Sequence, residues 1–281
     1  MAKAIMIQGT ASGVGKTVLT LALCRIFKED GYTVSPFKAQ NMTTNTYRTQ
    51  AGDEIAISQW LQALAAGVKP SANMNPVILK YSATQKATQV IVNGKPFDTV
   101  NAYKFKETKE KLVSTIMDAY SRLSSNVDIV VIEGAGSPVE LNLNRNDIVN
   151  MGMAIRAKAP VILISDIDRG GIFASLYGTL NLMRDTERQH VKATIVNRFK
   201  GDAAHFADGI RILEEITKLP VAGVVPYTDI NLPEEDSLFA DDKPFAETDD
   251  FDNEFNAIAQ NVRKSLNMKM IYDIIDNGVE A

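Results

Sequence analysis

The feature that most constrains the fold is a glycine-rich segment near the N-terminus, G-T-A-S-G-V-G-K-T at residues 9–17. It follows a short apolar run at residues 4–7 and precedes a stretch of helical period at residues 16–29. A glycine-rich turn between a strand and a helix presents backbone N–H groups at the helix N-terminus, where they suit a phosphate group. An ordinary strand-to-helix turn is the alternative, but the position after a first buried strand favours a phosphate-binding loop.

This segment is a variant of the P-loop. The usual spacing puts the first glycine at position 10, whereas this chain has Thr10 there and Gly9 one residue earlier. In such a loop Lys16 reaches the outer phosphates of a nucleotide, and the Thr17 hydroxyl binds Mg2+. The sequence therefore predicts a site for ATP and Mg2+. Nucleotide contacts are expected from Thr10, Ser12, Gly13, Val14, Gly15, Lys16 and Thr17.

Short apolar runs alternate with longer stretches of helical period, which is typical of repeated strand–helix units and a parallel sheet. Strands are expected at residues 4–7, 33–37, 129–132, 161–164, 193–196 and 221–225. Helices are expected at residues 16–29, 54–66, 102–124, 148–156, 172–184 and 203–218. A smaller edge strand or hairpin is expected at residues 90–93, before Gly94. The predicted fold is α/β: a P-loop NTPase-like, mostly parallel sheet with helices on both faces.

The chain has 281 residues, enough for one large or two small domains. Residues 1–240 carry the alternating pattern and are expected to form one P-loop domain. Residues 241–254 are acidic around a proline and lack periodicity, which predicts a linker. Apolar residues then recur at helical spacing from Phe255 to Ile274, so one amphipathic helix is expected within residues 255–281. That helix either packs back on the domain or leads towards a further part.

Charge and cysteine content exclude several classes of protein. With 30 Lys and Arg against 34 Asp and Glu, the net charge is -4, so the basic surface of a general nucleic-acid or anionic-membrane binder is missing. The single cysteine, Cys24, excludes an intramolecular disulfide framework and any multi-cysteine metal site. No apolar run approaches the roughly 18 residues of a membrane span. We expect a cytoplasmic protein with no nucleic-acid or membrane partner.

Polar residues follow several predicted strands at the same end of the sheet as the glycine-rich loop. Ligands of open parallel sheets bind beyond the carboxyl ends of the strands, so these residues are expected to share one site. Glu133, after the strand at 129–132, would hold Mg2+ directly or through water. The other strand-end candidates are Lys38, Gln40, Asn41, Asn45, Asp166, Asp168 and Asn197, with the run L-P-E-E-D-S-L at 232–238. Taken singly, each could also belong to an ordinary capped turn.

Together these segments resemble one family over about residues 5–238, the ATP-binding synthetase domain of the cobyric acid synthases. The matching segments, in order, are G-T-A-S-G-V-G-K-T, P-F-K-A-Q-N-M, E-I-A-I-S-Q-W-L-Q-A-L-A-A-G, M-N-P-V-I-L-K, E-G-A-G-S-P, D-I-D-R-G-G-I-F-A and L-P-E-E-D-S-L. The wider group includes dethiobiotin synthetase and cobyrinic acid a,c-diamide synthase, which share the variant P-loop. The resemblance therefore implies a dethiobiotin-synthetase-like fold.

The resemblance also implies a ligase reaction. ATP would phosphorylate peripheral carboxylates of adenosylcobyrinic acid a,c-diamide, and ammonia would displace the phosphate to give the amides of cobyric acid. Catalytic roles are implied for Lys16, Lys38 and Glu133. The implied Mg2+ ligands are Thr17, Glu54 and Glu133, and Asn197 is implied to contact the adenine base. Substrate contacts are implied for Lys38, Gln40, Asn41, Asn45, Asn75, Asp166 and Asp168.

The source of ammonia is where the chain departs from the family. Full-length members carry a C-terminal glutaminase domain with a cysteine nucleophile, and no such domain is recognisable here. Cys24 lies in the predicted helix after the P-loop, without a nucleophile-elbow sequence. We expect ammonia to come from a glutaminase domain or a separate subunit, so that the chain alone uses ammonium but not glutamine. A homodimer is a further expectation, because such folds often build sites across a dimer.

Two other functions remain open. One is the same chemistry on another carboxylate, as in a,c-diamide formation or dethiobiotin synthesis, and the Q-N-M and D-I-D-R-G-G runs argue against it. The other is a partner-regulated, partitioning-type ATPase. Those proteins carry an extra P-loop lysine at the position of Ala11. Hydrolysis of ATP without a carboxylate substrate would favour the ATPase.

Overall fold

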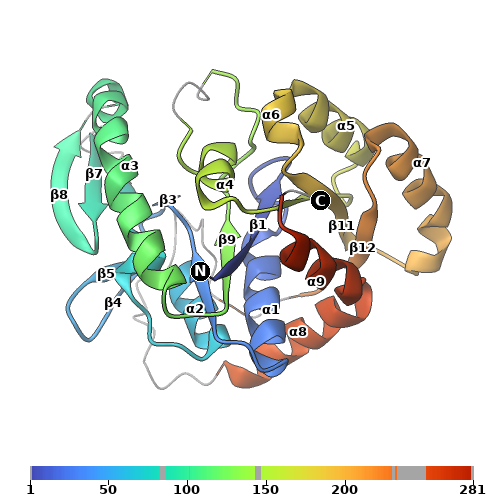
Figure 1. Ribbon diagram of the computed structural model, residues 1–281, viewed down its shortest axis with the longest axis horizontal. Coiled ribbons are helices and arrows are strands. Elements are labelled where there is room, and N and C mark those ends of the chain that lie inside the picture. Colours follow the sequence, from blue (N-terminus) through green and yellow to red (C-terminus); the bar gives the residue numbers. More distant parts are fainter. Residues whose placement is uncertain are drawn as a thin grey trace.

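The computed structural model describes residues 2–82, 87–100, 102–142, 147–229, 232 and 251–279. Its centre is a sheet of six parallel strands in the order β12-β11-β10-β1-β9-β2 (Figure 1). The strands are β1 (Lys3–Gly9), β2 (Val34–Phe37), β9 (Ile129–Glu133), β10 (Val161–Asp166), β11 (Val191–Phe199) and β12 (Val221–Pro226). Each strand predicted from an apolar run is present. The strand order reverses around β1, which places the glycine-rich loop at the position where open α/β sheets bind ligands.

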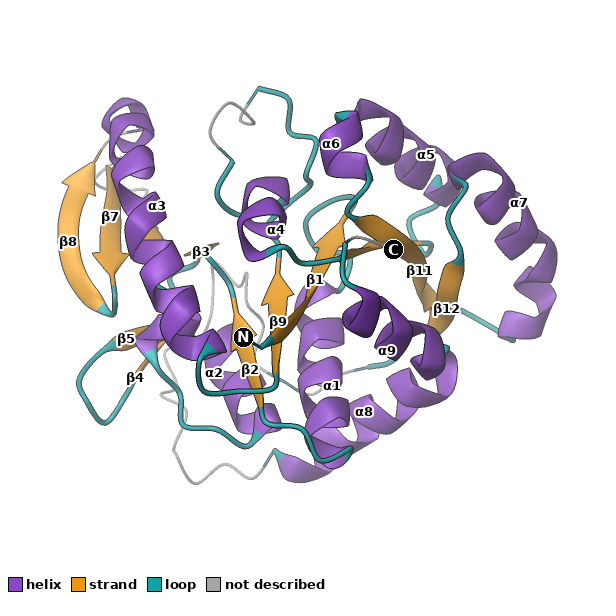
Figure 2. Cartoon of the chain, viewed as in Figure 1, coloured by secondary structure: helices purple, strands orange, loops and turns teal. Residues whose placement is uncertain are grey.

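Helices cover both faces of this sheet (Figure 2). Ile5 and Ile7 of β1 belong to one apolar core, and Ala4 and Met6 belong to the other, because successive side chains of a strand point to opposite faces. The first core includes residues of α1 (Lys16–Glu29) and α2 (Ile57–Ala66). The second includes residues of α3 (Ala102–Ser124), α4 (Met151–Ala157), α5 (Ile172–Leu182) and α7 (Ala207–Thr217). The predicted α/β class with helices on both faces is confirmed.

A second, smaller sheet lies beside α3, and its outer strands are at the left of Figure 1. Its strands are β3 (Gln40–Met42), β6 (Val77–Ser82), β7 (Ala87–Val92) and β8 (Lys95–Val100), in the order β3-β6-β7-β8. The hairpin expected near residue 94 joins β7 to β8, and Asn93 and Gly94 turn the chain with φ of 48° and 77°. Two further short strands, β4 (Thr46–Arg48) and β5 (Glu54–Ala56), pair antiparallel. A single 3-10 turn, η1 (Ala72–Met74), precedes β6.

Several helix boundaries differ from those expected. The helix predicted from residue 54 begins too early, because Glu54 to Ala56 form β5 and α2 starts at Ile57. The helix predicted from residue 148 starts at Met151, because the Asp147 carboxylate accepts hydrogen bonds from the backbone of the preceding turn. The helix expected at 172–184 ends at Leu182 and is followed by the short α6 (Asp185–Arg188). The stretch 203–218 divides into the 3-10 turn η3 (Ala203–Phe206) and α7.

The prediction of one C-terminal helix is wrong, because the segment forms α8 (Asp252–Ser265) and α9 (Met268–Asn277). The break occurs where the chain meets the edge of β12. There the Asn267 N–H donates to the Ala222 carbonyl oxygen at 2.8 Å, and the Asn267 side chain caps α9 by accepting from the Met270 N–H. Most of the expected linker, residues 241–250, lies outside the described residues.

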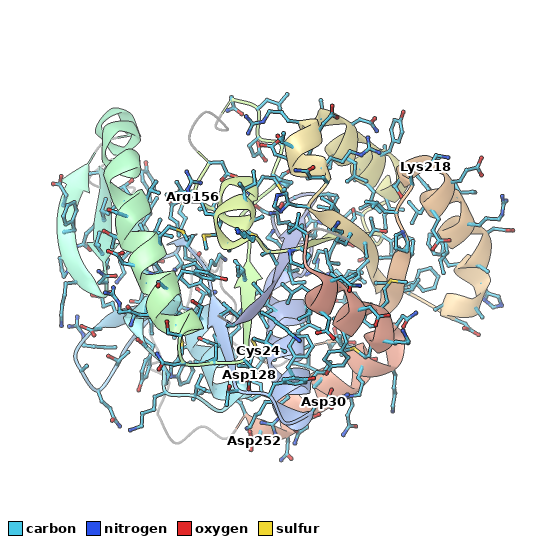
Figure 3. All side chains as sticks on the ribbon, viewed as in Figure 1. Cys24, Asp30, Asp128, Arg156, Lys218 and Asp252 are labelled. Carbon is cyan, nitrogen blue, oxygen red and sulfur yellow. The ribbon has the colours of Figure 1, made fainter. Side chains whose placement is uncertain are left out.

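The helix α8 packs along α1 and completes the first core. The Arg25 guanidinium of α1 donates to the Asn256 side chain at 2.9 and 2.6 Å and pairs with Asp252 at 3.1 Å. At the end of α1, Arg263 of α8 pairs with Asp30 at 2.9 Å; Figure 3 labels Asp30 and Asp252 in this region. The C-terminal helices are therefore part of the same packed domain. Among the described residues, no helix is long and apolar enough to cross a bilayer.

Candidate functional site

The glycine-rich loop has the geometry of a phosphate cradle. Gly13 and Gly15 have φ of 71° and 96°, a region that L side chains rarely adopt, so the loop turns sharply into α1. The Lys16 ammonium donates to the carbonyl oxygens of Ala11 at 2.9 Å and Gly136 at 3.2 Å. Lys16 is thereby held inside the loop, where the outer phosphates of a nucleotide are bound in proteins with this motif.

Asn197, at the end of β11, lies directly against this loop. Its amide donates to the Val14 carbonyl oxygen at 2.8 Å. A Cβ placed on Gly15 would lie only 2.2 Å from the Asn197 amide nitrogen. The φ of 96° favours glycine at position 15, and the close approach shows that Asn197 and the P-loop lie together.

The Glu133 carboxylate is the point where two other predicted site residues, Thr17 and Lys38, meet. Its Oε1 accepts hydrogen bonds from the Thr17 hydroxyl at 2.9 Å and from the Lys38 ammonium at 2.8 Å. The Glu133 side chain is fully buried and that of Lys38 is 6% exposed, so the two charges form a buried ion pair. The second carboxylate oxygen, Oε2, accepts from the Gln62 amide at 2.7 Å. Four side chains from β9, α1, α2 and the segment after β2 therefore converge at the carboxyl end of β9.

A chain of buried amides lies behind this carboxylate. Gln59 donates to Gln62 at 3.4 Å, and Asn41 donates to Gln59 at 3.0 Å and to the Ser58 hydroxyl at 3.2 Å. Asn41, Gln59 and Gln62 are all buried, so these contacts fix the orientation of each side chain. Asn41 is therefore linked to Glu133 through two glutamine side chains.

Gln40 and Asn75 each carry a buried side-chain oxygen that lacks a hydrogen-bond partner within the described part of the chain. The Asn75 amide nitrogen donates to the Lys38 carbonyl oxygen at 3.0 Å, so this side chain holds the backbone that presents Lys38. An unpaired buried oxygen is costly unless another group satisfies it. Gln40 and Asn75 therefore bring two unpaired, buried acceptors to the segment that carries Lys38.

Glu54, a predicted Mg2+ ligand, lies on β5 in a separate ionic cluster. Its carboxylate is paired with Lys80 of β6 and accepts from Thr46 at 3.1 Å and Arg48 at 3.3 Å. Burial alone would raise the pKa of Glu54, but Lys80, Thr46 and Arg48 together hold that pKa below its usual value. Glu54 is thus ionised and already has a cationic partner. No described contact joins it to Thr17 or Glu133.

The predicted residues after β10 are also held by cations. Asp166 accepts from the Arg198 guanidinium at 3.1 Å and from the Asp168 backbone N–H at 2.8 Å, and Asp168 pairs with Lys200 at 2.8 Å.

Asn45 is half-buried before β4, and its carbonyl oxygen accepts from the Ile57 N–H at 3.2 Å. Of the predicted run 232–238, only Leu232 lies within the described residues.

Comparison with known proteins places this geometry in a family. The model of the CobQ/CobB/MinD/ParA nucleotide binding domain matches residues 5–239. The chain is a member of this family. The match includes β1, the P-loop, Glu133 and Asn197, and it ends before the C-terminal helices. The Thr17–Glu133–Lys38 cluster therefore lies in a nucleotide binding domain.

Curated relatives of this nucleotide binding domain include cobyric acid synthases. That of Streptococcus sanguinis is 50% identical over 238 residues, which cover 85% of this chain and 48% of the relative. That of Clostridium novyi is 52% identical over 238 residues, covering 84% of this chain and 46% of the relative. Among solved structures, the MinD cell division protein of Aquifex aeolicus matches with a TM-score of 0.43 and 15% identity, over 81% of this chain and 83% of that chain. The chain spans about half the length of the curated relatives it matches.

The donor atoms of the domain fit a magnesium nucleotide. The Thr17 hydroxyl and the Glu133 carboxylate oxygen lie 2.9 Å apart beside the P-loop, and both are hard oxygen ligands of the kind Mg2+ prefers. In proteins, Mg2+ is usually bound by one or two carboxylates together with phosphate oxygens and water. Within the described ranges no three His, Cys, Asp or Glu side chains cluster as a metal site of their own. Thr17 and Glu133 are therefore the residues that would hold the metal, with phosphate and water completing its shell.

Three residues that build this site were not predicted from the sequence. Gln59 and Gln62 lie on the buried face of α2, and their spacing in an otherwise apolar helix was the available signal. Asn150 fixes the loop after β9, because its side chain accepts from the Ala135 N–H at 3.0 Å and donates to the Ala135 and Ser137 carbonyl oxygens at 2.6 and 3.2 Å. Asn150 and Ala135 are 15 residues apart, so their hydrogen bonds leave no local pattern in the sequence.

Proposed function

We propose that this nucleotide binding domain activates carboxylates of a corrinoid with ATP so that ammonia converts them to amides. The proposed substrate is adenosylcobyrinic acid a,c-diamide and the proposed product is cobyric acid. The identity of about 50% to cobyric acid synthases over most of the chain supports the choice of substrate. The observation that carries the chemistry is the convergence of Thr17, Lys38 and Glu133 beside the P-loop.

Activation is needed because a carboxylate oxygen is a poor leaving group. In the proposed reaction a carboxylate oxygen of the corrinoid attacks the γ-phosphorus of ATP, and the bond between that phosphorus and ADP breaks. The resulting acyl phosphate is attacked at carbon by ammonia, and inorganic phosphate leaves with the original carboxylate oxygen. ATP, ammonia and the carboxylic acid thus give ADP, phosphate and an amide.

The residues of the domain supply positioning and charge rather than a covalent intermediate. The loop N–H groups and Lys16 would hold the phosphate chain, and Asn197 would contact the adenine base. Magnesium, held by Thr17 and Glu133, would neutralise charge on the phosphates. Lys38 lies within hydrogen-bond distance of Glu133, so it is placed to attract the substrate carboxylate towards the phosphates.

Substrate orientation is assigned to the polar groups around Lys38. Gln40 and Asn75 offer unpaired oxygens, and Asn41 is fixed by the amide chain from Gln62. Asn45, Asp166 and Asp168 are proposed to contact the periphery of the corrin, whose amide groups can both donate and accept hydrogen bonds. Glu54 is proposed as an additional metal-site acid, which requires that its carboxylate leave Lys80.

The ammonia is proposed to come from a glutaminase domain or subunit. Cys24 is unsuited to this task, because the thiol is completely buried in α1 (Figure 3) and burial raises its pKa, with a further contribution from the Glu133 charge. A buried, protonated thiol is a poor nucleophile. We therefore expect this chain to use ammonium and not glutamine.

The test is phosphate release and amide formation by the purified chain with Mg-ATP, ammonium and adenosylcobyrinic acid a,c-diamide. The proposal predicts amide products by mass spectrometry and phosphate release that depends on the corrinoid. Glutamine in place of ammonium should give no product. Phosphate release that ignores the corrinoid, with no amide formed, would contradict the proposal and favour a partner-regulated ATPase.

A further inference from the structure

One arginine beside the phosphate loop has no role in the reaction described above. Arg169 lies in the turn between β10 and α5, at the same end of the sheet as the P-loop. A Cβ placed on Gly13 would lie 3.5 Å from a terminal guanidinium nitrogen of Arg169. The guanidinium therefore occupies the space beside Gly13, a loop residue with a φ of 71°.

Arg169 is held at one side only. Its Nε lies 3.7 Å from Asp166 Oδ2, a long ion pair, whereas Arg198 approaches the same oxygen at 3.1 Å. The neighbouring Asp168 carboxylate is paired with Lys200 at 2.8 Å. The Arg169 side chain is 71% exposed, so most of its surface is open to solvent and accessible to a ligand.

The backbone around Arg169 allows its side chain to adjust. Gly170 and Gly171 follow it with φ of 79° and 73°, and a Cβ on either would meet no atom within 4 Å. A turn without close neighbours can shift by the small distance that a bound phosphate requires.

We infer that the Arg169 guanidinium binds the phosphate chain of the nucleotide in the P-loop. A guanidinium presents several N–H donors in one plane and matches phosphate oxygens better than an ammonium group does. Lys16 approaches the phosphates from α1, and Arg169 approaches from the β10–α5 turn, so the two cations serve the same anion from different elements. Asp166 then acts as the anchor that aims the guanidinium. This inference rests on the proposed binding of ATP in the loop.

The experiment compares nucleotide affinity by calorimetry in the wild type, Arg169→Ala, Arg169→Lys and Arg211→Ala, using a non-hydrolysable ATP analogue, ADP and adenosine with Mg2+. Arg211 on α7 is the matched control, because its side chain is 68% exposed and its ion pairs of 3.8 Å are equally long. Loss of a charge-assisted hydrogen bond typically costs about tenfold in affinity at a partly exposed site. Urea unfolding of each variant checks that the fold is intact.

We expect Arg169→Ala to weaken binding of the ATP analogue about tenfold, Arg169→Lys to weaken it less, and adenosine binding to be unchanged. Arg211→Ala should bind within twofold of the wild type. If the wild type and Arg169→Ala bind the analogue equally well, the role of Arg169 is wrong, but the proposed function is not affected. A wild type that binds no nucleotide would overturn both this inference and the proposed function.

Discussion

Replacing Lys38 by methionine should lower the free energy of unfolding by much more than the removal of a surface lysine would. Glu133 would remain fully buried with Thr17 and Gln62 as neutral hydrogen-bond donors, but its charge would lose its cation. Removing one partner of a buried ion pair costs about 3–5 kcal/mol. Because the two neutral donors remain, we expect about 3 kcal/mol here. At roughly 2–4 °C per kcal/mol for a domain of this size, the melting temperature should fall by roughly 6–12 °C.

A double-mutant cycle isolates the ion pair from the packing of the lysine stem. Urea unfolding would be measured for the wild type, Lys38→Met, Glu133→Gln and the double variant. Removing both charges should recover more than half of the loss seen in Lys38→Met, since no uncompensated charge then stays buried. Lys269→Met is the control, because the Lys269–Asp273 pair is also short, at 2.7 Å, but its side chains are 84% and 54% exposed. If Lys38→Met and Lys269→Met cost the same, or the double variant is simply additive, the buried-pair argument is wrong.

Three further outcomes are expected. Gly15→Ala should weaken nucleotide binding measured by calorimetry, because the new Cβ would displace the Asn197 amide from the loop. Gly31→Ala, at a similar φ of 93° with no atom within 4 Å, should lose only some stability. Cys24 should resist a thiol reagent at pH 8 in the native protein and react in urea, and rapid native labelling would refute its burial. Because Lys80 helps to keep the pKa of Glu54 below 4.5, Glu54 stabilises the fold above that pH and the contribution is lost as the pH falls further. In Lys80→Met, the free energy of unfolding measured with urea should therefore change less with pH below 4.5 than in the wild type. The same pH dependence in both proteins would contradict this role of Lys80.

The central sheet could be predicted because its strands are buried on both faces. Runs such as V-I-L-I at residues 161–164 are entirely apolar, and the helix at Lys16–Glu29 begins and ends where its pattern does. The segment from Gln40 to Ala56 could not be predicted, because its strands have three residues each and half-exposed polar side chains. The helix break before Met268 is imposed by contact with the edge of β12, which the sequence pattern does not contain.

The site could be predicted in part, for the same physical reason. Thr17, Lys38 and Glu133 follow strands that are neighbours in the sheet, so strand order alone brings them together. Gln62 lies on α2, and its contact with Glu133 depends on how α2 packs on α1. The pairing of Glu54 with Lys80 depends on the second sheet, which was not expected beyond a single hairpin.

The proposed reaction transfers a phosphoryl group from ATP to a carboxylate oxygen. The most direct test uses adenosylcobyrinic acid a,c-diamide labelled with 18O in its free carboxylates, incubated with this chain, Mg-ATP and ammonium. An acyl phosphate predicts that 18O appears in the released inorganic phosphate in proportion to the amide formed. Amide formation with unlabelled phosphate would contradict the account, because the carboxylate oxygen would then have left by another route.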